Sequence, residues 1–228
     1  RGWSLAFAAA SGGSLLCAGL SRFLDDGEHR PDRSAGLASL WRVAKRPDQL
    51  RSALVISLVG SCFGSLFVFH QLYALELGIV EVQVFFVAYA AAAVAARLGL
   101  GGLGDRFGRQ RLASLMLVLY AAGAFGMTAL AQVGLAPLGA LFGLAHGLFY
   151  PAYNAMAVEN SPPGERGMRM ALFQGWFNAG VAGGSFALGF VAEAHGYPTI
   201  FVLSGLGIAV ALAVLRTTET KSAAASNS

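Results

Sequence analysis

Residues 101–111 combine one acid, three arginines and several glycines in a short run. The run reads Gly101-Gly-Leu-Gly-Asp105-Arg106-Phe-Gly108-Arg109-Gln110-Arg111. Glycine permits tight turns and unusual backbone angles, so the run predicts a turn between two helices. In such a turn Asp105 could bind an arginine or a helix amino terminus in one conformation and release it in another. These residues offer the chemistry of an electrostatic latch, and an ordinary basic turn is the alternative.

A second group of polar side chains lies inside long apolar segments. It consists of His70, Gln71, His146, Tyr150, Asn154, Gln174 and Asn178. Polar groups within a membrane are costly and usually face the interior of a helix bundle. We expect these side chains either to line a substrate cavity or to hydrogen-bond a neighbouring helix, and both interpretations stay open. His70 or His146 could also carry a proton, because imidazole changes charge near neutral pH.

The sequence lacks the residue patterns of an enzyme or a metal centre. Its two cysteines, Cys17 and Cys62, fall in apolar runs without metal-ligand spacing. No Asp, Glu or Lys stands in the middle of an apolar segment, and no nucleophile motif is present. We therefore expect no enzymatic activity, no cofactor and no bound metal. The basic residues are spread over several loops, so nucleic acid is not an expected partner.

The elements that must position these residues are long and apolar. Of the 228 residues 56% are hydrophobic and 12% are charged, about half the charged share of soluble domains. A bilayer accepts such a chain, because no polar shell is needed over the spanning region. Runs of about 20 mostly apolar residues, the length that spans a bilayer, lie near 3–20, 52–73, 82–100, 112–132, 136–157, 170–192 and 198–215. The sequence predicts an all-α polytopic membrane protein with seven spans.

Lysine and arginine gather in alternate loops between these segments. They occur in the stretch 21–51, in the turn 101–111, near 166–169 and in the tail 216–228. The loops near 74–81, 133–135 and 193–197 contain neither residue. Because cytoplasmic loops are enriched in Lys and Arg, we expect the long loop and the carboxy terminus in the cytoplasm.

Small residues recur one helical turn apart in several segments. They are Ala91, Ala95 and Gly99, then Gly139, Gly143 and Gly147, then Gly175, Ala179 and Gly183. Such ridges let membrane helices approach closely. Pro151 removes a backbone donor within the segment 136–157, and the residue four positions back is Gly147. A helix kink is therefore expected at Pro151.

The long polar stretch 21–51 has two parts. Residues 21–33 are highly charged, and we expect them to be flexible. From 35 to 46, an apolar helical face carries Leu37, Leu40, Trp41 and Ala44. That pattern is typical of a helix lying on the inner membrane surface, and an ordinary solvated linker is the alternative.

The run 101–111 resembles the cytoplasmic signature of the major facilitator superfamily: Gly, three residues, Asp-Arg, any residue, Gly-Arg and further basic residues. Gln110 departs from the commoner basic residue, and Arg111 supplies the charge one position later. In the family this cluster is understood as a gate that favours the outward-facing state. The resemblance carries that role to Gly101, Asp105, Arg106, Gly108, Arg109 and Arg111.

The position of the signature indicates which part of a transporter this is. The family repeats the signature in each six-helix half, and here four apolar segments follow it. Residues 1–20 thus resemble the sixth helix, 21–51 the loop between halves, 52–215 the seventh to twelfth helices, and 216–228 a cytoplasmic tail. We expect the amino-terminal half-bundle to be missing from this sequence. The stretches 143–151, 162–167 and 175–189 look like those of bacterial efflux-type members.

The resemblance implies a secondary active transporter of the bacterial inner membrane that moves a small organic solute by alternating access. Proton-coupled export is favoured, with the solute, protons, the lipid bilayer and the other half-bundle as partners. In this fold the first, fourth, seventh and tenth helices line the central path. That order makes His70, His146, Tyr150 and Asn154 the leading cavity candidates. Uptake of a small metabolite by the same fold, and a non-transporting sensor or scaffold, stay open as alternatives.

Overall fold

The computed structural model describes residues 2–23, 36–159, 161–162 and 164–226. Within these ranges all regular elements are helices. The chain divides into two compact units, residues 1–36 and 37–228. The first unit contains α1 (Gly2–Ser21). Most of the stretch 21–33, which the sequence predicts to be flexible, lies outside the described residues.

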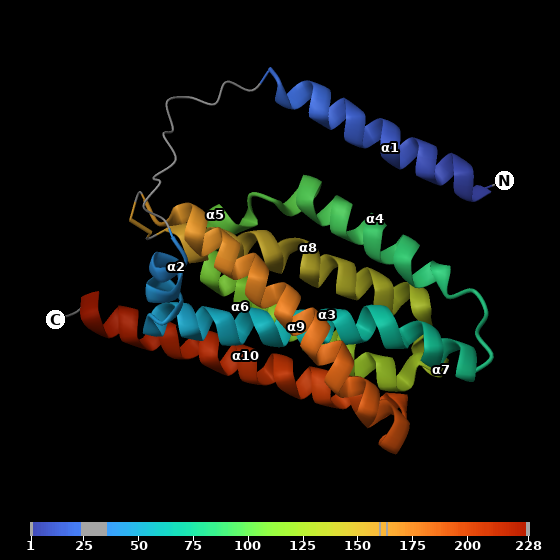
Figure 1. Cartoon of the computed structure of the whole chain (residues 1–228). Coiled ribbons are helices and arrows are strands. Elements are labelled where there is room, and N and C mark those ends of the chain that lie inside the picture. The colour runs from blue at the N-terminus through green and yellow to red at the C-terminus, as the bar shows by residue number, and fades with distance from the viewer. Residues whose placement is uncertain (1, 24–35, 160, 163, 227–228) are drawn as a thin grey trace. The chain divides into compact units, whose positions relative to one another are not determined.

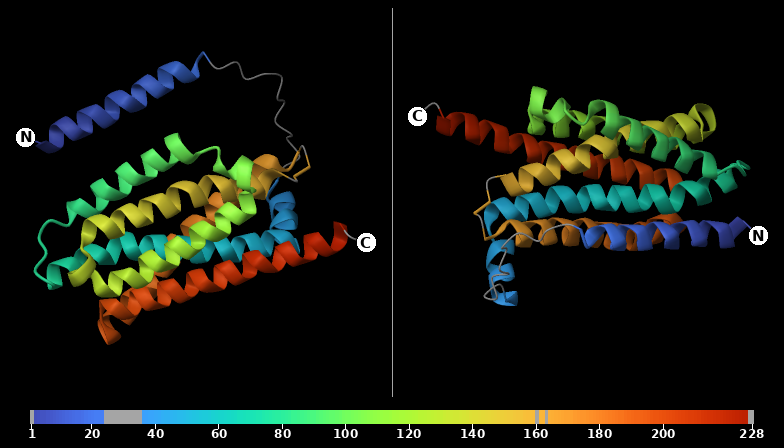
Figure 2. Two further views of the ribbon diagram at one scale, coloured as in Figure 1. Left: turned by 180° about the vertical axis from the view of Figure 1, so that it is seen from behind. Right: turned by 90° about the horizontal axis from the view of Figure 1, so that it is seen from above.

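The second unit is a bundle of long helices joined by short connections. It contains α2 (Leu37–Ala44), α3 (Pro47–Glu76), α4 (Gln83–Leu100), α5 (Leu103–Phe107), α6 (Arg109–Gly126), the 3-10 turn η1 (Met127–Ala129), α7 (Leu130–Val133), α8 (Leu135–Glu159), α9 (Arg166–His195) and α10 (Tyr197–Ser226). Helix α3 packs against α9 and α10, while α8 packs against α4 and α6 (Figure 1 and Figure 2). The long helices run side by side, and α2 lies across one end of them (Figure 1).

Five helical stretches of the described chain are long and apolar enough to cross a membrane by length and composition. They are Pro47–Glu76, Gln83–Leu100, Arg109–Val133, Leu135–Glu159 and Tyr197–Thr217. These stretches confirm the predicted all-α polytopic membrane fold. The predicted number of spans was seven, and neither α1 nor α9 is among the five. In α9, Gln174, Asn178 and repeated glycines lower the mean hydropathy, although the helix has 30 residues and packs along α3.

Glycines bring α8 into backbone contact with α4. A Cβ atom at Gly139 would collide with the backbone carbonyl of Phe85, and one at Gly143 with that of Tyr89. At Gly147 an added Cβ would lie 3.0 Å from the Cα of Ala93. The ridge of small residues predicted on α8 is therefore confirmed as a close helix contact.

The other two predicted ridges lie on open faces of the described bundle, and close approach of another helix there stays a prediction. On α4, the residues Ala91, Ala95 and Gly99 are exposed. On α9, added Cβ atoms at Gly175 and Gly183 would meet nothing within 4 Å. Helix α9 instead approaches α3 through Gly180 and Gly184, which lie against Ser57 and Ser61. Both faces of α4 and α9 carry small residues, so spacing alone does not select the buried face.

Residues of the long polar stretch form the short helix α2. Val43 and Ala44 are buried in a cluster with Leu172 of α9. Leu37 and Trp41 are 79% and 59% exposed. The apolar face predicted for this helix is thus divided between packing on α9 and open surface, and its contact with a membrane stays a prediction.

Candidate functional site

The run 101–111 forms a tight turn between α4 and α6, with the one-turn helix α5 inside it. Gly108 has φ 86° and ψ 129°, a backbone conformation that residues with a Cβ rarely adopt. At Gly101 an added Cβ would lie 2.6 Å from the carbonyl oxygen of Arg97. Both glycines of the motif are therefore required by the backbone of this turn.

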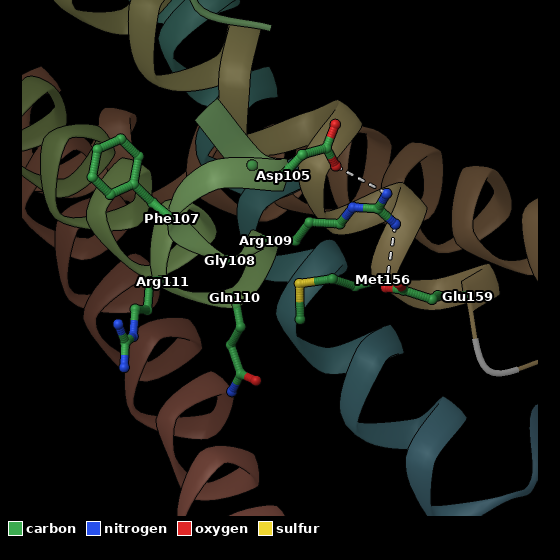
Figure 3. Close-up of a pocket in the computed structure, with 9 residues that line it drawn as sticks. Asp105, Phe107, Gly108, Arg109, Gln110, Arg111, Met156 and Glu159 are labelled. Atoms are coloured by element: carbon green, nitrogen blue, oxygen red, sulfur yellow. Dashed lines mark hydrogen bonds and ion pairs between the residues drawn. The ribbon is translucent and has the colours of Figure 1, made fainter. Parts of the chain in front are cut away.

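Arg109 holds this turn to the end of α8. Its guanidinium lies 3.2 Å from Asp105 Oδ1 and 3.2 Å from Glu159 Oε2. Figure 3 shows the arginine side chain between the two carboxylates. The side chains of Asp105 and Glu159 are 73% and 55% exposed. Exposed pairs of this kind contribute only about 0–1 kcal/mol each, so the contacts form and break easily.

The remaining polar residues of the motif point elsewhere. Gln110 donates from Nε2 to the backbone carbonyl of Leu215 in α10, at 3.1 Å. Within the described chain Arg106 and Arg111 form no ion pair, and both are exposed. Arg111 and Phe107 lie on the far side of the turn from Arg109 (Figure 3). Where the signature usually has a basic residue, Gln110 thus makes an uncharged contact that ties α6 to α10.

A cavity of about 610 Å³ opens at this turn (Figure 3). Its lining consists of Gly104, Asp105, Phe107, Gly108, Arg109, Gln110, Arg111, Met156 and Glu159. Sequence analysis did not single out Glu159. The signal that could have found it is an acid at the end of the apolar segment 136–157, on the same side of the predicted bundle as the 101–111 turn.

A second ion-pair network joins the starts of α3 and α9. Arg46 donates to both carboxylate oxygens of Glu165, at 2.7 and 2.8 Å. Arg169 donates to Asp48 at 3.0 Å, and its side chain is only 10% exposed. We call the end of the bundle that holds this network and the 101–111 turn the basic end. The network was not predicted, because pairing charges from two distant loops requires knowing that α3 and α9 are neighbours.

Both candidate histidines, His70 and His146, are buried. The Nδ1 of His70 lies 2.5 Å from the carbonyl oxygen of Leu66, and its ring lies 4.1 Å from that of Phe85. The Nδ1 of His146 lies 3.2 Å from the hydroxyl of Tyr120, and its ring lies 4.7 Å from that of Phe63. Each imidazole is therefore enclosed by aromatic rings of neighbouring helices. Tyr120 and Phe63 were not singled out from the sequence.

Three of the remaining candidates form a hydrogen-bonded row across α8 and α9. Tyr150 donates its hydroxyl proton to Gln174, and Gln174 donates to Asn178 at 3.3 Å. Gln174 and Asn178 are exposed, whereas Gln71 is half-buried and donates to the Phe67 carbonyl of its own helix at 3.1 Å. The three side chains thus form one polar row, and Gln71 is not part of it.

Asn154 and Pro151 line a further cavity of about 610 Å³ between α4 and α8. Its lining consists of Arg97, Gly101, Gly104, Asp105, Arg109, Leu112, Gly147, Leu148, Tyr150, Pro151, Ala152, Asn154 and Ala155. The Oδ1 atom of Asn154 is buried and has no hydrogen-bond partner among the described residues. This cavity joins two groups that the sequence treated separately, the 101–111 turn and the polar residues of α8. Among the described residues no three His, Cys, Asp or Glu side chains lie close enough together to hold a metal ion.

Comparison with known families identifies the origin of this architecture. The family model described as Major Facilitator Superfamily matches residues 73–228, from the last residues of α3 onward. The chain belongs to the Major Facilitator Superfamily. The matched range includes the 101–111 turn, and the resemblance inferred from that turn is confirmed. No solved structure matches the chain.

Membership of the Major Facilitator Superfamily makes this chain part of a membrane transporter rather than an enzyme family. Its substrate is a small molecule, and its surroundings are a lipid bilayer. The five apolar helical stretches agree with an integral membrane protein.

Proposed function

We propose that this chain is the carboxy-terminal half of a secondary active transporter that works by alternating access, with the 101–111 turn as its gate. The observation that carries the proposal is the position of Arg109 between Asp105 and Glu159, both at 3.2 Å. This group links the turn to the end of α8. Because both acids are largely exposed, the group can rearrange at small energetic cost when the bundle moves.

In the proposed arrangement α1 corresponds to the sixth helix and the second unit to the seventh to twelfth. The basic end lies in the cytoplasm of a bacterium. Its arginines in the 101–111 turn and at the starts of α3 and α9 favour that orientation. The amino-terminal half-bundle, in a longer protein, supplies the other wall of the central path.

The solute is proposed to be a small organic molecule that contacts the row Tyr150–Gln174–Asn178. These side chains offer hydroxyl and amide groups on an exposed apolar face. No carboxylate lies in the middle of a described apolar helix, so His146, bonded to Tyr120, is the proposed proton carrier within this half. Proton-coupled export follows the resemblance of α8 and α9 to efflux-type members.

The test uses the complete protein that contains this chain, expressed in inside-out membrane vesicles. The vesicles are energised with a proton gradient and offered a mixed pool of dyes and metabolites, and mass spectrometry identifies what accumulates. We expect gradient-dependent accumulation that a protonophore abolishes. The matched control is a vesicle containing the Asp105→Asn variant. Accumulation that ignores the protonophore would contradict proton coupling, and accumulation only in right-side-out vesicles would contradict export.

A further inference from the structure

Helices α4 and α8 meet along two matched ladders with a spacing of four residues. On α4 the ladder is Phe85, Tyr89, Ala93 and Arg97, and on α8 it is Gly139, Gly143, Gly147 and Pro151. The first three rungs are contacts in which an added glycine Cβ would meet the α4 backbone. The numbers rise together on both helices, so the helices run parallel. Continuing the ladder by one turn places Arg97 at the level of Pro151.

Pro151 interrupts the hydrogen bonding of α8 at this level. Proline has no backbone N–H, so the carbonyl of Gly147 cannot accept the bond that an α-helix normally supplies from four residues ahead. In a membrane an unsatisfied backbone carbonyl is costly, and proline is tolerated where a neighbouring group replaces the lost donor. Helix α8 continues through Pro151 to Glu159 without interruption.

Arg97 provides a replacement donor. Its Nε atom donates to the Gly147 carbonyl oxygen at 3.4 Å, across the interface between the two helices. The bond is long, but a charged donor strengthens it. We infer that Arg97 is a positioning residue for transport: its Nε–H replaces the donor that Pro151 lacks and holds α8 against α4 beside the gate.

This role connects two parts of the transporter. Arg97, Gly147 and Pro151 line the same cavity as Asp105 and Arg109 of the gate turn. The backbone carbonyl oxygen of Arg97 is also the atom that an added Cβ at Gly101 would meet, at the start of the turn. A movement of α8 at Pro151 therefore acts on α4 within one helical turn of the gate. The hydrogen-bonding role of Arg97 does not depend on the proposed function. Only its expected effect on the transport rate rests on the proposed alternating access.

A double-mutant cycle in the complete protein tests the inference. Pro151→Ala restores the backbone N–H, so the Gly147 carbonyl no longer needs Arg97. We expect Arg97→Met alone to lower the initial transport rate about fivefold. In the P151A background the same substitution should change the rate less than twofold. Equal effects of Arg97→Met in both backgrounds would overturn the inference.

Two conservative variants separate hydrogen bonding from charge. Glutamine places an amide N–H the same number of bonds from the Cα as the Nε of arginine, without a charge. Arg97→Gln should therefore keep at least half of the wild-type rate, and Arg97→Lys, whose nitrogen lies one bond further out, should be no better. A protein that tolerates Arg97→Lys but not Arg97→Gln uses the charge, and that result would refute the assigned role.

A measurement independent of the substrate keeps the inference testable if transport is not observed. Spin labels at positions 94 and 136 would report the distance between α4 and α8, because Val94 is 56% exposed and Ala136 is also exposed. The exposed Cys17 would first be replaced by Ser, while the buried Cys62 is retained. Arg97→Met should broaden the distance distribution, and P151A should suppress that broadening. Absent transport in the wild type would contradict the proposed function, whereas equal broadening in both backgrounds would contradict the role of Arg97.

Discussion

At the scale of single residues, Asp105 and Glu159 share one guanidinium, that of Arg109. The two distances are equal at 3.2 Å, and both carboxylates are more than half exposed. Such contacts add little to stability, which fits the proposed role of this group in switching. By contrast, the side chain of Arg169 at the same basic end is 10% exposed and fixed to Asp48. The basic end thus combines an exposed ion group at the proposed gate with a more buried one between α3 and α9.

The exposed ion group of Arg109, Asp105 and Glu159 leads to a prediction for Asp105→Asn. Removing this charge should lower transport at least tenfold, because the gate loses one of its two states. The free energy of unfolding should change by less than about 1 kcal/mol, since the lost pair is exposed. Transport and thermal unfolding of the purified complete protein would be measured together. Glu193→Gln, at an exposed acid on the opposite end of α9, is the control and should leave both unchanged. Strong destabilisation by Asp105→Asn would show that the pair is structural.

The more buried ion group of Arg169, Asp48 and Glu165 leads to a different prediction. Arg169→Met removes the cation that Asp48 and Glu165 share, although Glu165 keeps its two hydrogen bonds from Arg46. Loss of the hydrogen bond from the buried guanidinium to Asp48 should lower the free energy of unfolding by about 1–2 kcal/mol. Arg166→Met is the matched control, because Arg166 is exposed and forms no ion pair within the described chain. Its effect should stay within about 0.5 kcal/mol in chemical or thermal unfolding. Equal effects of the two variants would contradict a structural role for the network.

At the scale of helices, two packed pairs rely on glycine in different registers. Helix α8 presents Gly139, Gly143 and Gly147 to α4, while α9 presents Gly180 and Gly184 to α3. In both pairs the partner atoms include backbone atoms, which cannot move aside as a flexible side chain can. The bundle is therefore held by close backbone approach and not only by large apolar side chains.

This packing predicts opposite outcomes for two similar substitutions. Gly143→Ala places a Cβ against the carbonyl of Tyr89 and should lower the free energy of unfolding by about 1–3 kcal/mol. Gly183→Ala, in a helix position with nothing within 4 Å, should be neutral or stabilising by up to about 1 kcal/mol. Thermal unfolding in detergent would measure both variants. A stable Gly143→Ala protein would mean that α4 and α8 do not approach as closely as described.

The helices and the turn at 101–111 could be predicted from the sequence because those depend on local signals. Long apolar runs and the spacing of Gly101, Asp105 and Gly108 need no knowledge of neighbours. The pairing of Arg109 with Glu159 of α8 was not predicted, because it depends on how far α8 extends beside α6. The same reason explains why the sequence did not show that α9 approaches α3 through Gly180 and Gly184 rather than through Gly175 and Gly183. The contacts between helices could therefore be described only from the structure.

At the scale of the whole molecule, charge is distributed unequally between the two ends of the bundle. Arginines occur at the starts of α3, α6 and α9. The connection after α3 carries Glu81, and the last turn of α9 carries Glu193 and His195. Cytoplasmic loops of membrane proteins are enriched in Lys and Arg, so this asymmetry favours the proposed orientation, with the basic end in the cytoplasm.

The orientation can be tested with single cysteines and a maleimide that does not cross membranes. Arg111→Cys and Arg166→Cys, at exposed positions of the basic end, should react in inside-out vesicles and stay unlabelled in intact cells. Glu81→Cys and Glu193→Cys, at exposed positions of the opposite end, should show the reverse pattern. Labelling after detergent solubilisation controls for reactivity. Because all four positions lie within one compact unit, a mixed pattern would contradict the up-and-down bundle itself, and a fully inverted pattern would contradict only the proposed orientation.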